Sequence, residues 1–325
     1  MAMNNNIRFH NSHLFPFFRM FLIPHPSALI PCFLALLLCA ACSRVPQPQP
    51  VTPDDYLLRI VAEFQRFAAV DVYRLGMPRD AANRNAFHAA VERLDAYEAE
   101  LPNKNTDIVC FTRAESLLRL GAYAKARDNF ARSADAATSS PLAAKARERI
   151  VRCEQFLDAL RPDEQPAERV KDQLAQLESR RERFVALEGK LAVTPDALVV
   201  KRAREQAEMQ IAHFLFEQRM VLEHGTRRAL DAANDLTRTH EGSNRVFAHR
   251  LMLGTFYFDL ARTMEIATPA DGAGFDLTGC LELSAKAREQ LTLVSRADGY
   301  EEKLEGIARL QDLDAFMRRM RRFAE

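Results

Sequence analysis

The chain has 325 residues, of which 27% are charged and 48% hydrophobic, and its formal net charge at pH 7 is +1. A chain of this length can bury a substantial core and form one or two domains. Because its charges balance, we expect no nucleic-acid partner. Its 11 glycines and lack of tryptophan, with alanine and leucine frequent, leave few residues that form turns, so the composition predicts an all-α fold.

The first predicted element is an apolar stretch at residues 33–41, which is preceded by basic residues and ends in two alanines. A helix that crosses a bilayer needs about twenty apolar residues, so this stretch is too short to span a membrane. Its order of basic, apolar and small residues is that of a secretory signal. We therefore predict a signal peptide over residues 1–41, with cleavage before Cys42.

The sequence CAAC at residues 39–42 resembles the lipobox of bacterial lipoproteins, in which a signal peptidase cuts before a cysteine that is then acylated. The resemblance implies that Cys42 is lipidated, for example with palmitate, and that the lipid anchors the protein to a membrane. Cys39 stands where the family prefers leucine. Ser43 in place of aspartate implies an outer-membrane location facing the periplasm. An ordinary secreted protein cut near Ala41 is the alternative.

Residues 42–53 read CSRVPQPQPVTP, a stretch rich in proline and glutamine. Such a stretch favours extended polyproline II over a helix or a strand. We predict that it is a linker between the lipid anchor and a folded body. The true start stays open between Met1 and Met20, because a start at Met20 shortens the signal but removes its arginines.

From residue 54 onward, apolar residues recur every three or four positions, which predicts amphipathic helices. One apolar stripe covers residues 60–68 and the next covers 87–97, with a glycine and a proline between them. This pattern predicts a helical hairpin at the start of an N-terminal repeat region, residues 54–160.

Residues 107–134, DIVCFTRAESLLRLGAYAKARDNFARSA, resemble a tetratricopeptide repeat. The resemblance implies a small helix contact, a turn glycine, a first packing residue, a second small contact and a large groove-filling residue. In that order, these are Ala114, Gly121, Tyr123, Ala126 and Phe130. Ser133 stands where alanine is usual, and the first-helix tryptophan of the family is missing.

A second copy begins at Ala207 within a C-terminal repeat region, residues 193–325. Its small and turn positions are Ala212, Gly225, Ala229 and Ala233. Segments 281–294 and 304–323 predict a closing pair of helices. Because a repeat buries its apolar face only against its neighbours, several copies predict a helical solenoid with a concave surface.

Residues 161–192 connect the two repeat regions. The RPDEQP sequence at their start interrupts the helices, and apolar residues then recur at helical spacing among dense charges. We predict one long charged helix, residues 167–192, that packs along the solenoid. Thr194 is expected to cap the next helix. The alternative is a coiled coil between chains, which would make the protein a structural homo-oligomer.

The order of lipobox, short linker and helical hairpins is similar to that of outer-membrane-assembly lipoproteins of the BamD type, although the long charged helix departs from their architecture. The likeness implies a lipid-anchored envelope scaffold or adaptor. Its partners would be other envelope proteins, bound through a tetratricopeptide-like groove. The sequence indicates no small-molecule substrate and no cofactor.

Three cysteines remain besides Cys42, namely Cys110, Cys153 and Cys280. A disulfide between Cys110 and Cys153 stays open, but buried free thiols are favoured because nothing fixes the geometry of such a bridge. No metal site is expected, because His240 and His249 lack the helical spacing of zinc-binding histidines. We expect His240 in a polar loop and His249 on the following helix.

Residues 114–116, AES, resemble the neighbourhood of the catalytic glutamate in lytic transglycosylases, but the rest of that motif is absent. The sequence has no phosphate-binding loop and no nucleophile elbow, so we predict that the protein is not an enzyme. The alternative is a peptidoglycan hydrolase with Glu115 as its acid. We expect Glu115 to be an exposed residue of the first helix of its hairpin.

Overall fold

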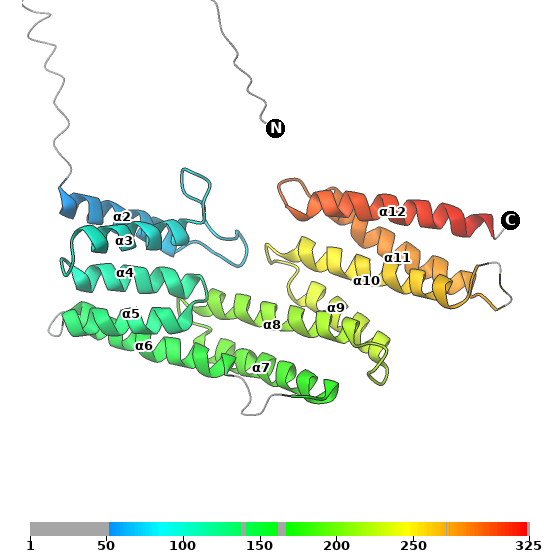
Figure 1. Ribbon diagram of the computed structural model, residues 1–325, viewed down its shortest axis with the longest axis horizontal. Coiled ribbons are helices and arrows are strands. Elements are labelled where there is room, and N and C mark those ends of the chain that lie inside the picture. Colours follow the sequence, from blue (N-terminus) through cyan, green and yellow to red (C-terminus); the bar gives the residue numbers. More distant parts are fainter. Residues whose placement is uncertain (1–51, 138–140, 162–166, 271, 273, 324–325) are drawn as a thin grey trace, which may run out of the picture. The chain divides into compact units, whose positions relative to one another are not determined.

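The computed structural model describes residues 52–137, 141–161, 167–270, 272 and 274–323 (Figure 1). The predicted signal peptide, Cys42 and nearly all of the linker lie outside these residues. Contacts divide the chain into two units, Met1–Thr52 and Pro53–Glu325. The described residues form eleven helices. The one other regular feature among them is an isolated β-bridge within a loop. The predicted all-α fold is confirmed.

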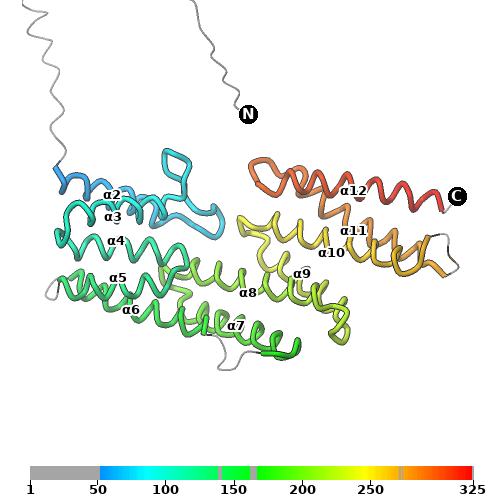
Figure 2. The backbone as a smooth tube through the Cα atoms, in the orientation of Figure 1, coloured from blue at the N-terminus to red at the C-terminus, as the bar shows by residue number. Residues whose placement is uncertain are grey.

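Consecutive helices pack against one another along the whole of the second unit, and Figure 2 shows the chain reversing direction between them. The helices are α2 (Pro53–Ala68), α3 (Ala86–Glu100), α4 (Thr106–Arg119), α5 (Tyr123–Ala136), α6 (Pro141–Leu160), α7 (Val170–Leu191), α8 (Ala197–Glu217), α9 (Gly225–Thr239), α10 (Val246–Ala267), α11 (Leu277–Ser295) and α12 (Glu302–Arg322). The architecture is therefore a stack of helical hairpins.

Local sequence explains where several helices begin. Asn85 precedes α3, and its side chain accepts hydrogen bonds from the backbone N–H groups of Phe87 and His88. Asp276 does the same for Gly279 at the start of α11. These contacts satisfy N–H groups that have no partner within the helix. The predicted cap at Thr194 is wrong, because α8 begins at Ala197 and the Thr194 hydroxyl donates backwards to the Leu191 carbonyl instead.

Two large apolar clusters form the core. The first lies among α4, α5, α6, α7 and α8, where the rings of Tyr123 and Phe156 stack with centroids 4.4 Å apart. The second lies among α8 to α12, where Phe216 and Phe256 stack at 3.7 Å. Because α8 contributes to both clusters, it joins the two parts of the stack.

One loop makes contacts that reach far along the chain. The loop between α2 and α3 meets α8, where Arg202 donates a hydrogen bond of 2.7 Å to the Val72 carbonyl. It also meets the turn before α10, where the Asn244 N–H donates to the Tyr73 carbonyl at 2.8 Å. A solenoid whose repeats contact only their neighbours has no such link. The loop therefore ties the first hairpin to the middle of the stack.

The helices of the described residues are not membrane spans, since none combines the necessary length with enough apolar character. Helix α7 occupies the connecting region and packs on α8. Its buried side chains are Leu174, Phe184, Leu187 and Leu191, which are apolar positions of the predicted helix. The face they form supports α8, which carries Arg204, Glu205 and Glu208.

Candidate functional site

The packing residues predicted in the first hairpin lie in and beside the core. The four outside the turn belong to one buried cluster: Ala114, Tyr123, Ala126 and Phe130. Gly121 lies in the turn between α4 and α5 with a φ of +78°. This left-handed conformation favours glycine, which lacks a Cβ. These residues hold two helices together, and Gly121 and Tyr123 also line a cavity of about 210 Å³.

The predicted residues of the second copy are also buried. Ala212 and Ala233 belong to the second large cluster, whereas Ala229 packs in a smaller one with Leu174 and Ile211. Gly225 begins α9, and a Cβ there would collide with the backbone of Arg219. Both hairpins thus use small residues for close approach, while their assignment as tetratricopeptide repeats stays a prediction.

An open groove runs along α7, α8 and α9. It consists of two adjoining cavities with volumes of about 250 and 380 Å³, and both cavities share Arg181, Arg204 and Glu208. We call it the central groove. It is lined by Arg181, Glu182, Val185, Ala186, Arg204, Glu208, Ile211, Ala232, Asp235, Leu236, Arg238 and Thr239.

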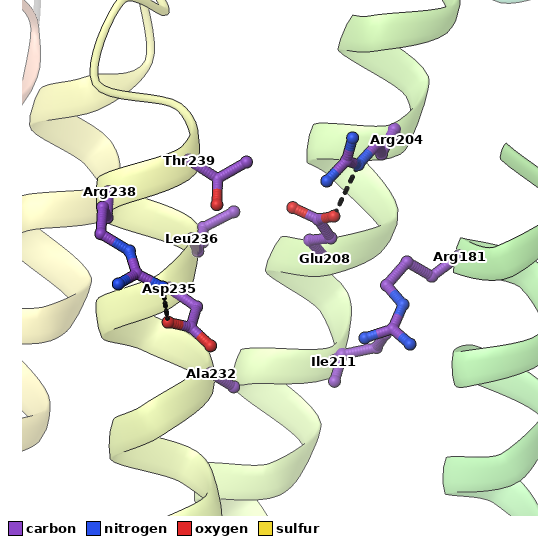
Figure 3. Close-up of a pocket in the computed structure, with 9 residues that line it drawn as sticks. All are labelled: Arg181, Arg204, Glu208, Ile211, Ala232, Asp235, Leu236, Arg238 and Thr239. Carbon is purple, nitrogen blue, oxygen red and sulfur yellow. Dashed lines mark hydrogen bonds and ion pairs between the residues drawn. The ribbon is translucent and has the colours of Figure 1, made fainter. Parts of the chain in front are cut away.

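The central groove has an apolar floor and a charged rim. Ile211 and Leu236 are buried beneath it, and Figure 3 shows charged side chains from all three helices around them. On the α9 side, Arg238 pairs with Asp235 at 2.8 Å. On the α7 side, the Arg181 side chain is 40% exposed, and its guanidinium lies 3.8 Å from the Glu182 carboxylate.

Arg204 is held more firmly than the other arginines of the central groove. Its guanidinium contacts Glu208 at 2.7 Å and Glu188 at 3.0 Å. Among the described residues Arg181 makes no such hydrogen bond and has only the longer contact with Glu182, so it is the groove cation best placed to meet an incoming carboxylate. A guanidinium binds a carboxylate through two parallel hydrogen bonds, which gives direction as well as strength.

Glu208 connects the groove to a buried set of side chains that we call the histidine cluster. The cluster comprises Tyr73, Glu205, Glu208, His240 and His249. The Glu208 carboxylate lies 2.8 Å from Nε2 of His240, and Nδ1 of His240 lies 2.8 Å from the Tyr73 hydroxyl. An ionised carboxylate only accepts hydrogen bonds, so Nε2 of His240 donates to Glu208, while Nδ1 shares a second hydrogen bond with the Tyr73 hydroxyl.

The second pair of the histidine cluster is fully buried. Nε2 of His249 lies 2.7 Å from the Glu205 carboxylate, and their side chains are 0% and 1% exposed. Nδ1 of His249 has no hydrogen-bond partner among the described residues. Burial opposes ionisation of Glu205, but hydrogen bonds from His249 and Ser243 outweigh it and hold the Glu205 pKa below its ordinary value.

Burial and hydrogen bonding also have opposite effects on the pKa of Glu208, at the edge of the central groove. Burial opposes ionisation of Glu208, but hydrogen bonds from His240 and Arg204 hold its pKa below the ordinary value. Burial, followed by the charge of Glu205, raises the pKa of Tyr73 to about 12. The cluster is therefore a set of ionised glutamates and neutral phenol that links the groove to the loop between α2 and α3.

The sequence around His240 and His249 did not indicate their hydrogen bonds with Glu208 and Glu205. His240 was predicted in a polar loop, yet its side chain is 1% exposed. Its partner Glu208 is 32 residues away, and the partner of His249 is 44 residues away. Within the described part of the chain, no cluster of three or more His, Cys, Asp or Glu side chains has the arrangement to hold a metal ion. His213 lies at the surface with its ring edge-to-face on Phe256.

The prediction that Glu115 is exposed is wrong. Glu115 is 5% exposed and belongs to what we call the arginine cluster: Glu115, Arg149, Arg152 and Asp196. Arg149 contacts Glu115 at 2.6 Å and Asp196 at 2.7 Å. A catalytic acid must come within hydrogen-bond reach of its substrate, whereas this carboxylate is occupied by an internal ion pair. This geometry does not support Glu115 as the acid of a peptidoglycan hydrolase.

The expectation of buried free thiols is confirmed for Cys110, Cys153 and Cys280. Burial and the charge of Glu115 raise the pKa of Cys153 to about 12. The thiolate is the reactive form of cysteine, so Cys153 is an unreactive core residue.

No protein-family model and no curated protein matches the chain.

Proposed function

We propose that the protein is a cell-envelope scaffold or adaptor that binds a segment of another envelope protein in the central groove. The observation that carries this proposal is the pair of adjoining cavities with an apolar floor and a charged rim. Grooves of this kind bind amphipathic segments, whose apolar side chains enter the floor while their polar side chains meet the rim.

The groove also indicates the chemistry of that segment. Arg204 and Arg238 already pair with carboxylates of the protein itself, whereas Arg181 has no hydrogen-bonded partner among the described residues. We therefore expect the bound segment to place an acidic side chain at Arg181 and apolar side chains over Ile211 and Leu236. Val185, which is 43% exposed on α7, lies at the rim where the segment would pass.

The envelope location rests on the lipobox resemblance, because Cys42 lies outside the described residues. In this proposal the acylated Cys42 anchors the protein to the outer membrane on its periplasmic side, and residues 43–53 separate the helices from the lipid surface. Mass analysis of the native amino-terminal peptide tests the anchor. Acylated Cys42 is expected, and an unmodified Cys42 thiol contradicts it.

Site-specific photo-crosslinking tests the groove. A photoreactive amino acid replaces Val185 in the full chain, expressed in the cells that encode it. The matched control carries it at Val151, which is 55% exposed on α6 and outside the groove. We expect a discrete protein adduct from position 185 that position 151 does not give and that Arg181→Glu weakens at least about ten-fold, the loss of one charge-assisted contact.

Two outcomes contradict the proposed groove. One is the same set of adducts from both positions. The other is an adduct at position 185 that Arg181→Glu leaves unchanged.

A further inference from the structure

The C-terminal end of α12 carries several exposed arginines close together in sequence. Arg318, Arg321 and Arg322 are all exposed, and among the described residues none of them has an ion pair or a hydrogen bond. Elsewhere in the structure, arginines such as Arg149 and Arg204 are tied to two carboxylates each. The three guanidinium groups at the end of α12 are therefore available to an anion from outside the chain.

Helix geometry places these arginines together. Residues advance by about 100° per position around an α-helix, and the buried side of α12 is marked by Phe316 and Met320. Arg318 and Arg322 are four positions apart and lie on the opposite, solvent-facing side. Arg321 flanks them on one side, so three positive charges project from the C-terminal end of α12.

The neighbouring end of α10 extends this surface. Arg319 pairs with Glu265 at 2.6 Å, which brings the last turns of α10 and α12 together. Next to Glu265, Ile266 is 76% exposed, and Phe323 after α12 is 48% exposed. Arg262 on α10 holds its guanidinium over the Phe258 ring at 5.8 Å. We call this surface the basic patch; it consists of Arg262, Ile266, Arg318, Arg319, Arg321, Arg322 and Phe323.

Carboxylates near the basic patch do not neutralise it. Glu265 is taken up by Arg319, and Asp314 pairs with Arg288 on α11. Asp312 lines a cavity of about 300 Å³ beside Arg262 and Arg319, and Glu325 is the next acid along the chain. Arg318, Arg321 and Arg322 thus have no carboxylate partner among the described residues, although the whole chain is nearly neutral. The excess positive charge is a local property of this surface.

We propose that the basic patch docks on an anionic lipid surface. Guanidinium groups match the phosphates of lipid headgroups, and clustered arginines near such a surface are attracted to it by about 1 kcal/mol each. The exposed Phe323 and Ile266 suit the boundary between headgroups and acyl chains. Nucleic acid would use the arginines but not the aliphatic Ile266, so the combination of side chains favours a lipid surface.

This docking is independent of the central groove, whose lining residues lie on other helices. It is also separable from the proposed lipid anchor, because Cys42→Ser removes the thiol that would be acylated. All proteins in the test are therefore full chains that carry Cys42→Ser. They share one amino-terminal segment, so that segment contributes equally to every comparison.

The test is co-sedimentation with vesicles of phosphatidylcholine alone or mixed with phosphatidylglycerol. The patch variant is Arg318→Gln, Arg321→Gln and Arg322→Gln. The matched control replaces three exposed arginines outside the patch and groove with glutamine: Arg59, Arg66 and Arg147. We expect the parent to prefer the anionic vesicles, and the patch variant to bind them about a hundred-fold more weakly, which is roughly five-fold per arginine.

The control variant is expected to bind like the parent, and added salt is expected to weaken the parent's binding. Equal binding of the parent to both vesicle types overturns the proposal, as does an equal loss in both variants. Binding to a single-stranded oligonucleotide without binding to vesicles also overturns it, in favour of a nucleic-acid site. Should the triple variant lose its helical circular dichroism, Arg322→Gln alone must still reduce binding about five-fold.

Discussion

The arginine cluster and the histidine cluster both stabilise buried carboxylates, but they do so with different partner side chains. Each buries carboxylates among helices that are distant in sequence, and each pairs those carboxylates with cations or hydrogen-bond donors. Arginine keeps its charge at every pH at which proteins fold, whereas histidine and glutamate exchange protons near neutral and acidic pH. The comparison teaches that a missing partner leaves an arginine of the first cluster with a charge it cannot lose, whereas Glu205 of the second cluster can take up a proton.

Removing a carboxylate from the arginine cluster has the largest expected effect. Asp196, which is 1% exposed, accepts from Arg149 at 2.7 Å and from Arg152 at 3.2 Å. Asp196→Ala leaves Arg149 with Glu115 alone and takes this carboxylate from Arg152. Neither largely buried guanidinium can lose its charge, so the free energy of unfolding falls by about 3–5 kcal/mol. Urea unfolding followed by circular dichroism measures it. The exposed Asp312 provides the control, since Asp312→Ala should change stability by less than about 0.5 kcal/mol.

Breaking the histidine cluster has a smaller effect that changes with pH. His249→Leu leaves the Glu205 carboxylate buried without its histidine donor, which costs about 2–3 kcal/mol at neutral pH. Unlike arginine, Glu205 can relieve this by taking up a proton, because burial then raises its pKa. A raised pKa stabilises the fold below the unfolded-state value and loses that contribution as pH rises.

The deficit of His249→Leu relative to wild type should therefore shrink as pH falls. Unfolding midpoints at neutral pH and near pH 5, where glutamate begins to protonate, measure this change. His213→Leu at the surface is the control. A deficit that stays constant with pH would show that Glu205 does not respond as a proton acceptor.

The hydrogen bond between Tyr73 and His240 is expected to contribute less to stability. Tyr73→Phe removes the hydroxyl and keeps the ring, which lies under the Lys201 ammonium at 4.4 Å. The expected loss is about 1 kcal/mol, accompanied by faster amide exchange in the loop between α2 and α3. Tyr56→Phe, at a 40% exposed position of α2, should change neither quantity.

The smallest expected effect is on how much folding stability the protein loses at acidic pH when one buried glutamate is replaced. The pKa values of Glu205 and Glu208 lie below the ordinary 4.5, so both glutamates stabilise the fold above that pH. This contribution is lost as pH falls through their folded-state pKa values. Glu205→Gln should therefore lose less stability than wild type on going from neutral to acidic pH, whereas Glu241→Gln at the surface should lose as much as wild type.

The features that depend on local spacing could be predicted from sequence. Helical periodicity predicted the all-α fold, and small residues at Ala114, Ala126, Ala212 and Ala233 predicted buried positions. Those inferences succeed because a helix must turn its apolar and small side chains toward a neighbouring helix.

The buried ion pairs could not be predicted in the same way. Glu115 meets Arg149 from α6, and His240 meets Glu208 from α8, so each pairing depends on how helices stack. One signal was present for α8. Glu205 and Glu208 are three positions apart, and Ala212 and Ile211 continue the same side of the helix. Carboxylates on a side that is otherwise small and apolar indicate buried acids that need partners.

The link from Val72 and Tyr73 to α8 and the α9–α10 turn has a consequence for how the chain folds and comes apart. Linear repeat arrays unravel from an end, one unit at a time, because each unit depends only on the next. Here the first hairpin is pinned by residues made more than a hundred positions later, as the Arg202–Val72 hydrogen bond shows. The native contacts of the first hairpin form only after most of the polypeptide has been synthesised. Because these contacts are far apart in sequence, we expect slower and more cooperative folding.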